Sequence, residues 1–276
     1  MSHKFVDGSA MFDEDNLVSC AGLVPVMTLA EHTRLPDLPS EKISITTTKV
    51  ASGAANPAPK LLTLIAGMCT GADSIDDIDL LRSGGMTHLF AGVYAPSTVG
   101  TLLREFSFGH ARQLESVLRE HLIALTARVE ILPGLAKQAF LDIDSLLRPV
   151  HGHAKQGASY GHTKIAGKQI LRKGLSPLAT TLSTADSAPI ITGMRLRAGK
   201  AGSGKDAGRM VTQAIVTARA AGATGALVVR GDSAYGTRAR SSRRACARTC
   251  ASRSSWPRTP PSNARSTPSP TRRGPR

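Results

Sequence analysis

The fold of this chain is decided by residues 226–261, ALVVRGDSAYGTRARSSRRACARTCASRSSWPRTPP. The first part is an apolar run that ends at Asp232, as expected for a buried strand with an acid at its end. The second part is rich in arginine, serine, alanine and proline and contains no acid. A strand that belongs in a folded sheet therefore leads directly into a segment without the large apolar side chains that a core needs.

Positive charge is concentrated in the last part of the chain. The net charge of the 276 residues is +15, and residues 233–276 contain 11 Arg and no Lys, Asp or Glu, which leaves +4 for residues 1–232. The 41% hydrophobic content predicts that most of the chain is globular. A mildly basic body with a strongly basic end suits a polyanion such as nucleic acid.

Several classes of protein are disfavoured by the sequence. It has no apolar run of about 18 residues, so we predict no membrane partner. The N-terminus lacks the apolar core of a signal peptide, and four cysteines do not make a disulfide scaffold in a chain of this length. We therefore expect a cytoplasmic, nucleoid-associated protein.

Residues 1–130 are predicted to form a mainly helical region. Ser74 and Asp77 have the spacing of a capping box, and residues 40–50, SEKISITTTKV, show the β-branched alternation of a strand. Apolar residues recur at helical spacing in two later segments: Val99, Leu102, Leu103, Phe106 and Leu114, Val117, Leu118, Leu122. These segments fit either a compact helical bundle or a DNA-binding helix-turn-helix that presents Arg112 or Arg119.

Residues 131–238 show a different pattern, and the sequence predicts three strands, a helix and a fourth strand. The strands are expected in KQAFLDIDSLL, SPLATTLST, SAPIITGMRLR and GALVVRGD. Between the last two, residues 205–223 have the apolar stripe of an amphipathic helix. This helix can supply the crossover that a parallel strand requires, which predicts an α/β fold.

Two acids lie at the ends of two of these strands. Asp144 follows the first strand and Asp232 ends the last. If the two strands are parallel neighbours, their C-terminal ends meet at the edge where open α/β sheets place their sites. Two close carboxylates repel each other unless a cation lies between them, and Mg²⁺ favours such oxygen ligands. The alternative is that each Asp only ends a strand and caps a turn.

The blocks LDIDSLLRPVHGHAKQGASYGHTKIAG, GLSPLATTLSTADSAPIITGMRLRAGKAGS and VVRGDSAYG resemble bacterial insertion-sequence DDE transposases of group 1. The resemblance covers residues 18–238. It implies an RNase H-like core, two divalent ions (Mg²⁺ or Mn²⁺), and DNA cleavage and strand transfer at the ends of an insertion sequence. By this resemblance Asp144 and Asp232 are the catalytic, metal-binding acids, and Asp142 is a third residue of the metal site, as a supporting acid or a neighbour of the metal.

The chain departs from the family at the third acid. The resemblance implies a Glu well downstream of Asp232, but the last Glu in the sequence is Glu130 and no Asp follows Asp232. We therefore predict a partial core over 131–238 and a disordered basic tail over 239–276. The bias of this tail towards Arg, without Lys, suggests a frameshift near residues 237–239. The alternative is a basic DNA-binding arm.

Basic groups near the acids are candidates to hold the DNA backbone, because phosphate contacts position a duplex without reading its sequence. The predicted DNA-binding residues are Lys155, Tyr160, Lys164, Arg172, Lys173, Arg195 and Arg197. The expected partner is double-stranded DNA, both transposon ends and target, and a homodimer is a further expectation.

Two other motifs are weaker. GKAGSGKD, residues 199–206, nearly matches a phosphate-binding P-loop, but position 206 is Asp where Ser or Thr is required. FLDIDSLL also resembles the opening of haloacid-dehalogenase-type phosphatases, in which Asp142 would be the nucleophile and Asp144 the acid/base. The sequence thus predicts a transposase impaired by the lack of its third acid. The alternative is a non-enzymatic remnant that binds element ends or inhibits a full-length transposase.

Overall fold

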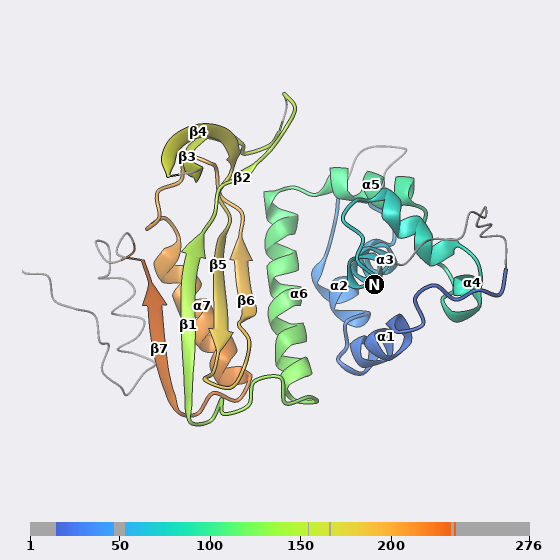
Figure 1. The fold of residues 1–276 in the computed structure, drawn as a ribbon, viewed down its shortest axis with the longest axis horizontal. Coiled ribbons are helices and arrows are strands. Elements are labelled where there is room, and N and C mark those ends of the chain that lie inside the picture. Colours follow the sequence, from blue (N-terminus) through green and yellow to red (C-terminus); the bar gives the residue numbers. More distant parts are fainter. Residues whose placement is uncertain (1–14, 47–52, 154, 166, 233–234, 236–276) are drawn as a thin grey trace, which may run out of the picture.

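The computed structural model describes residues 15–46, 53–153, 155–165, 167–232 and 235. The segment 239–276, predicted to be a disordered tail, lies outside these residues. Helices come first along the chain and a mixed α/β part follows (Figure 1). This order matches the α/β fold class and the mainly helical N-terminal region that the sequence predicts.

The N-terminal part is built from six α-helices and one 3-10 helix within the described residues. Two apolar clusters hold them together, one around Leu38, Leu61 and Leu102 and the other around Ile78 and Met86. The helices are α1 (Leu23–His32), α2 (Asp37–Lys42), α3 (Pro57–Cys69), η1 (Asp76–Arg82), α4 (Met86–Leu89), α5 (Pro96–Glu105) and α6 (Phe108–Thr126).

Two local predictions in this part need correction. Residues 40–42 belong to α2 and residues 43–46 form no strand; residues 47–50 of the predicted strand lie outside the description. The helix after Ser74 is the 3-10 helix η1, and the side chain of Asp77 accepts hydrogen bonds from the amide and hydroxyl of Ser74 (2.8 and 2.7 Å). The predicted pair is present, but it starts a tighter helix.

The C-terminal part contains a four-stranded sheet in the order β6-β5-β1-β7. The elements are β1 (Gln138–Ser145), β5 (Leu178–Ser183), β6 (Ile190–Arg195), α7 (Ala207–Ala220) and β7 (Ala226–Gly231). β5 is antiparallel to β1 and β6, whereas β7 is parallel to β1. The three strands, helix and strand occur where the sequence predicts them, and α7 makes the crossover to β7.

The core of this part lies between the sheet and α7. Ala139, Leu141 and Ile143 point from β1 into this core, and alternate residues Phe140, Asp142 and Asp144 lie on the other face. The apolar stripe of α7 packs against the sheet: Ala207, Met210, Val211, Ala214, Ile215 and Ala218 are all buried. One face of β1 is thus fixed by packing, which leaves its acids on the opposite face.

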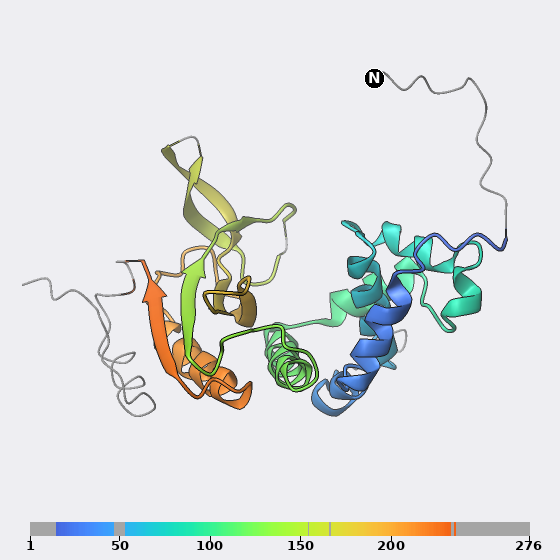
Figure 2. The same cartoon turned by 60° about the horizontal axis from the view of Figure 1, so that its bottom comes forward.

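A second, three-stranded sheet was not expected from the sequence. Its order is β2-β4-β3, from β2 (Arg148–Pro149), β3 (Ser159–Ile165) and β4 (Lys168–Leu175). It lies beyond the end of the larger sheet at which β1 and β7 finish (Figures 1 and 2). The chain passes directly from β1 into this sheet, which places its basic side chains at the same end of the molecule as the acids.

Helix α6 lies between the large sheet and the other N-terminal helices (Figure 1). It contacts α2 on one side and β6 on the other. Arg119 on this helix is within 3.6 Å of Glu115 and largely covered. Helix α6 is thus packed on two sides, and whether it presents Arg112 or Arg119 to DNA stays a prediction.

Candidate active site

The candidate site is formed where β1 and β7 end side by side. The parallel pairing runs from Gln138 opposite Ala226 to Ile143 opposite Gly231. Asp144 and Asp232 each follow the last paired residue in sequence, so the pairing brings the two acids to neighbouring positions. Both residues are exposed. The condition that the sequence left open, that these two strands are parallel neighbours, is met in the structure.

Asp144 is held more firmly by the sheet than Asp232. Asp144 is still within the antiparallel pairing of β1 with β5, opposite Ala179, and its carboxylate accepts a hydrogen bond from the amide of Ser145 (2.7 Å). Asp232 lies one residue beyond the end of β7.

Asp142 lies two residues before Asp144 on the same face, and it is paired with an arginine. The guanidinium of Arg230 donates to both carboxylate oxygens of Asp142, at 2.6 and 2.7 Å, and lies over the ring of Phe140 at 4.4 Å. The hydrogen bond to Asp142 raises the pKa of Arg230, and burial acts in the opposite direction. The negative charge of Asp142 is therefore largely compensated by its neighbour.

Tyr235 joins the two acid-bearing segments. Its hydroxyl donates to Oγ of Ser145 at 3.0 Å, and its amide donates to the carbonyl of Asp232 at 2.9 Å. Burial raises the pKa of Tyr235 above its usual value, and the charges of Asp144 and Asp232 add to this effect, while the bond to Ser145 opposes it. The phenol is therefore close enough to both carboxylates to sense their charge. Tyr235 was not singled out from the sequence. The available signal was its place three residues after Asp232, in the motif VVRGDSAYG.

The arrangement fits a divalent cation in part. Mg²⁺ is usually held by one or two protein carboxylates, and water and substrate phosphate complete its shell. Asp144 and Asp232 supply two such carboxylates from adjacent strands. Within the described residues no group of three or more His, Cys, Asp or Glu side chains forms a metal cluster. A cation placed between Asp144 and Asp232 would have two protein ligands, and substrate or a further acid would have to supply the rest of its shell.

The predicted DNA-binding residues fall into two groups. Lys155, Tyr160 and Arg172 are exposed on or beside the three-stranded sheet. Lys173 is partly buried and donates from Nζ to the carbonyl of His153 at 2.9 Å. Lys164 is in β3, and the position of its side chain is outside the description. All five lie at the end of the molecule that carries the acids.

Arg195 is not available to DNA, which corrects the prediction. It is 3% exposed, and its guanidinium donates to Glu115 on α6 at 3.1 Å and to Gln213 on α7 at 3.0 Å. Its charge holds three elements together inside the protein.

Arg197 is likewise buried, at 5% exposure, and the DNA contact predicted for it is not supported. It donates to the carbonyls of Ser176 (3.1 Å) and Lys205 (2.8 Å), and more weakly to those of Gly202 and Ser203. Burial lowers the pKa of Arg197. The P-loop-like segment therefore turns its carbonyl groups towards the guanidinium of Arg197. A phosphate-binding loop would instead turn its amide groups towards an anion.

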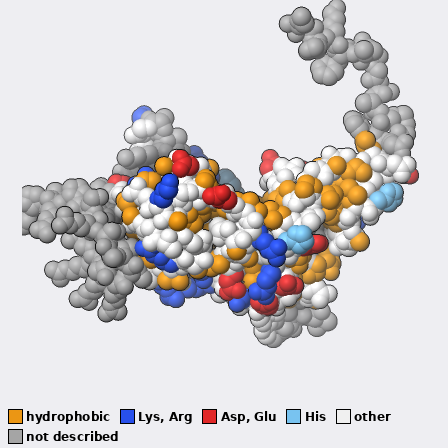
Figure 3. Space-filling model, turned by 90° about the horizontal axis from the view of Figure 1, so that it is seen from below, with side chains coloured by type: hydrophobic (Ala, Val, Ile, Leu, Met, Phe, Trp, Pro, Cys, Tyr) orange, Lys and Arg blue, Asp and Glu red, His pale blue; other side chains and the backbone are white. Residues whose placement is uncertain are grey.

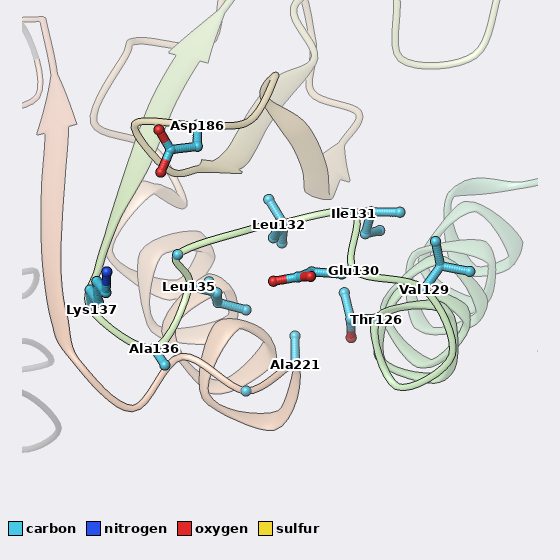
Figure 4. Close-up of a pocket in the computed structure, with 12 residues that line it drawn as sticks. Thr126, Val129, Glu130, Ile131, Leu132, Leu135, Ala136, Lys137, Asp186 and Ala221 are labelled. Atoms are coloured by element: carbon cyan, nitrogen blue, oxygen red, sulfur yellow. The ribbon is translucent and has the colours of Figure 1, made fainter.

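A pocket of about 530 Å³ lies at the other end of the sheet, near the start of β1 and the end of α6 (Figure 4). Glu130, Lys137 and Asp186 are its charged lining residues. Seen from this end, acidic and basic side chains are mixed on the surface (Figure 3). The pocket is thus separate from Asp144 and Asp232.

No helix among the described residues is long and apolar enough to cross a membrane.

Comparison with known families agrees with this geometry. A family model described as transposase DDE domain group 1 matches residues 7–251, which is most of the chain and extends past residue 238. No curated protein and no solved structure was found to match. The family match overturns the phosphatase alternative. Since the match covers the helices, both acid-bearing strands and the crossover helix between them, the chain belongs to the group 1 DDE transposase family.

Proposed function

We propose that Asp144 and Asp232 are the catalytic acids of this transposase and hold a divalent ion, Mg²⁺ or Mn²⁺. Family membership gives the general function, DNA transposition, and the use of divalent metal ions. The observation that supports the specific residues is the parallel pairing of β1 with β7, which ends one residue before each acid. No other pair of acids in the described residues lies at the ends of neighbouring parallel strands.

The two carboxylates would orient the reacting groups at a phosphodiester of the element end. A bound divalent ion activates the attacking oxygen and stabilises the leaving oxygen of such a displacement. Asp144 is fixed by β5 and by the amide of Ser145, so it presents the more rigid ligand. Asp232 approaches from β7, and substrate phosphate would occupy the open side of the site.

DNA would be guided to the acids by the three-stranded sheet. Residues 146–185 contain six Lys and Arg and no Asp or Glu. Such a uniformly basic segment attracts the phosphate backbone. Lys155, Tyr160 and Arg172 are its exposed members among the proposed contacts; Lys173 is partly buried, and Lys164 is a residue of β3 in the same sheet. The duplex would therefore lie across this sheet before it reaches Asp144 and Asp232.

We further propose that cleavage by the 276-residue chain is weak. Residues 233–276 contain no carboxylate side chain to serve as the third acid. The alternative function is a DNA-binding remnant that occupies element ends or inhibits a full-length copy, either alone or as a homodimer. Three further statements remain predictions: the nucleoid location, the frameshift, and the division of the chain into 1–130, 131–238 and 239–276. The gene sequence from codon 220 onward, read in all frames, tests the frameshift.

A nicking assay distinguishes the enzyme from the binder. The full chain is incubated with supercoiled plasmid carrying an element end, with Mg²⁺ or Mn²⁺. We expect slow nicking that is lost in Asp144→Ala and Asp232→Ala and retained in Asp186→Ala, which changes an acid at the opposite end of the sheet. End-binding in gel shift without metal-dependent nicking would instead favour the non-enzymatic function.

A further inference from the structure

We infer that Tyr235 and Ser145 form a clasp that positions Asp232 against Asp144 and thereby sets the metal affinity of the site. Both are positioning residues, and this inference rests on the proposed function of the two acids. The clasp is defined by the hydrogen bond from the Tyr235 hydroxyl to Oγ of Ser145, at 3.0 Å.

The sheet alone does not fix the spacing of the two acids. Its pairing between β1 and β7 ends at Ile143 and Gly231. Asp144 is still held by β5, but Asp232 lies past the end of its own strand. A connection outside the sheet would therefore help to keep the separation of the two carboxylates constant.

The clasp supplies that connection through short contacts on both sides. On the β1 side, the amide of Ser145 donates to the carboxylate of Asp144 at 2.7 Å while its hydroxyl accepts from Tyr235. On the β7 side, the amide of Tyr235 donates to the carbonyl of Asp232 at 2.9 Å. The contacts thus run from one acid to the other without passing through the sheet.

The ring of Tyr235 is anchored as well as its hydroxyl. It is 7% exposed and belongs to the apolar core between the sheet and α7. It also lies against Gly231, where an added Cβ would be 3.5 Å from the ring and 2.9 Å from the side chain of Ile143. A ring held on one side by packing and at its tip by a hydrogen bond has little freedom, so the carbonyl of Asp232, which accepts from the amide of Tyr235, is constrained with it.

The inference is tested by Mn²⁺ binding to the full chain, with free Mn²⁺ measured by electron paramagnetic resonance. Tyr235→Phe and Ser145→Ala each remove one side of the clasp, and the double variant removes both. We expect each single variant to bind Mn²⁺ roughly fivefold more weakly, by the usual strength of one hydrogen bond. The double variant should be no weaker than either single one, because the two residues act through one contact. Ser145→Thr keeps a hydroxyl at this position, so its Mn²⁺ affinity should stay close to that of the wild type, in contrast to Ser145→Ala.

Two controls separate this effect from general destabilisation and from failure of the proposed site. Thr192→Val removes a buried hydroxyl that bonds Thr180 in the same sheet, so it should lower the melting temperature and leave Mn²⁺ affinity unchanged. Asp144→Asn and Asp232→Asn should abolish binding; if they do not, or if the wild type binds no Mn²⁺, the metal pair fails and the clasp with it. If they do abolish it while Tyr235→Phe and Ser145→Ala bind as tightly as the wild type, the clasp alone is overturned. Additive losses in the double variant would also overturn it.

Discussion

Two regions of the molecule contain an arginine paired with a carboxylate, and they use the pair differently. Between α6, β6 and α7, the side chains of Arg195 and Glu115 are 2% and 3% exposed. On the open face of β1 and β7, the side chains of Arg230 and Asp142 are 51% and 35% exposed. The first pair is closed off from solvent and ties helices to the sheet, whereas the second lies beside Asp144 and Asp232. Burial therefore separates an architectural pair from one that shapes the site.

Breaking the buried pair should produce the largest effect. Glu115→Gln leaves the charge of Arg195 without its carboxylate, and two of the Arg195 nitrogens already have no hydrogen-bond partner among the described residues. We expect the free energy of unfolding to fall by about 3 kcal/mol, as is typical when one member of a buried ion pair is removed. Chemical denaturation measures this change.

The matched control is Glu120→Gln on the same helix. Glu120 pairs with Lys42 at 2.8 Å, but both side chains are about one-third exposed. Its loss should cost less than about 1 kcal/mol, because solvent screens such a pair. Equal costs for the two variants would contradict the architectural role of the buried pair.

The exposed pair should act on metal affinity more than on stability. Arg230 lies opposite Asp142 and two residues before Asp232. Removing its positive charge in Arg230→Gln should strengthen Mn²⁺ binding, and Asp142→Asn, which leaves that charge uncompensated, should weaken it. At about 7 Å in water each change amounts to roughly 1 kcal/mol for a doubly charged ion, or about fivefold.

The double variant Asp142→Asn/Arg230→Gln sharpens this comparison. It restores the net charge beside the acids, so its Mn²⁺ affinity should return close to that of the wild type. If Asp142 is itself a metal ligand and not only a supporting acid, Asp142→Asn will abolish binding and the double variant will not recover it. Titration of all three variants decides between the two roles.

The same contrast explains what the sequence could and could not predict. Local patterns located the strands that carry Asp144 and Asp232 and the crossover helix α7, but they left the pairing of β1 with β7 as a condition, because α7 joins β7 to β6 and not to β1. The burial of Arg195 did not follow, since its partner Glu115 is 80 positions away and nothing near it in sequence signals a pair. The second sheet was missed because β4 is exposed along most of its length and lacks alternation of apolar and polar residues.

An exposed arginine on the second sheet should affect DNA binding without affecting stability. Arg172→Gln removes one charge from the basic surface of β3 and β4. If Arg172 contacts a phosphate, the slope of log affinity against log salt should become shallower by about 0.9. Lys137→Gln is the control, because Lys137 is exposed at the opposite end of the sheet. A slope that is the same for both variants would place the DNA elsewhere.

The smallest effect concerns a histidine between two helical elements. His121 on α6 is within 3.4 Å of the carbonyl of Thr33, and burial lowers the pKa of its imidazole, an effect that the contact with Thr33 partly offsets. Because the folded protein then binds this proton less readily than the unfolded chain, stability should be fully present above the unfolded pKa of about 6.5 and decline as the pH falls below it. His121→Gln should flatten this decline in unfolding measurements between about pH 7 and pH 5. His88, which is exposed on α4, provides the matched control: His88→Gln should leave the decline unchanged. The comparison of the two histidines extends that of the two arginines, since burial again decides which charge the fold depends on.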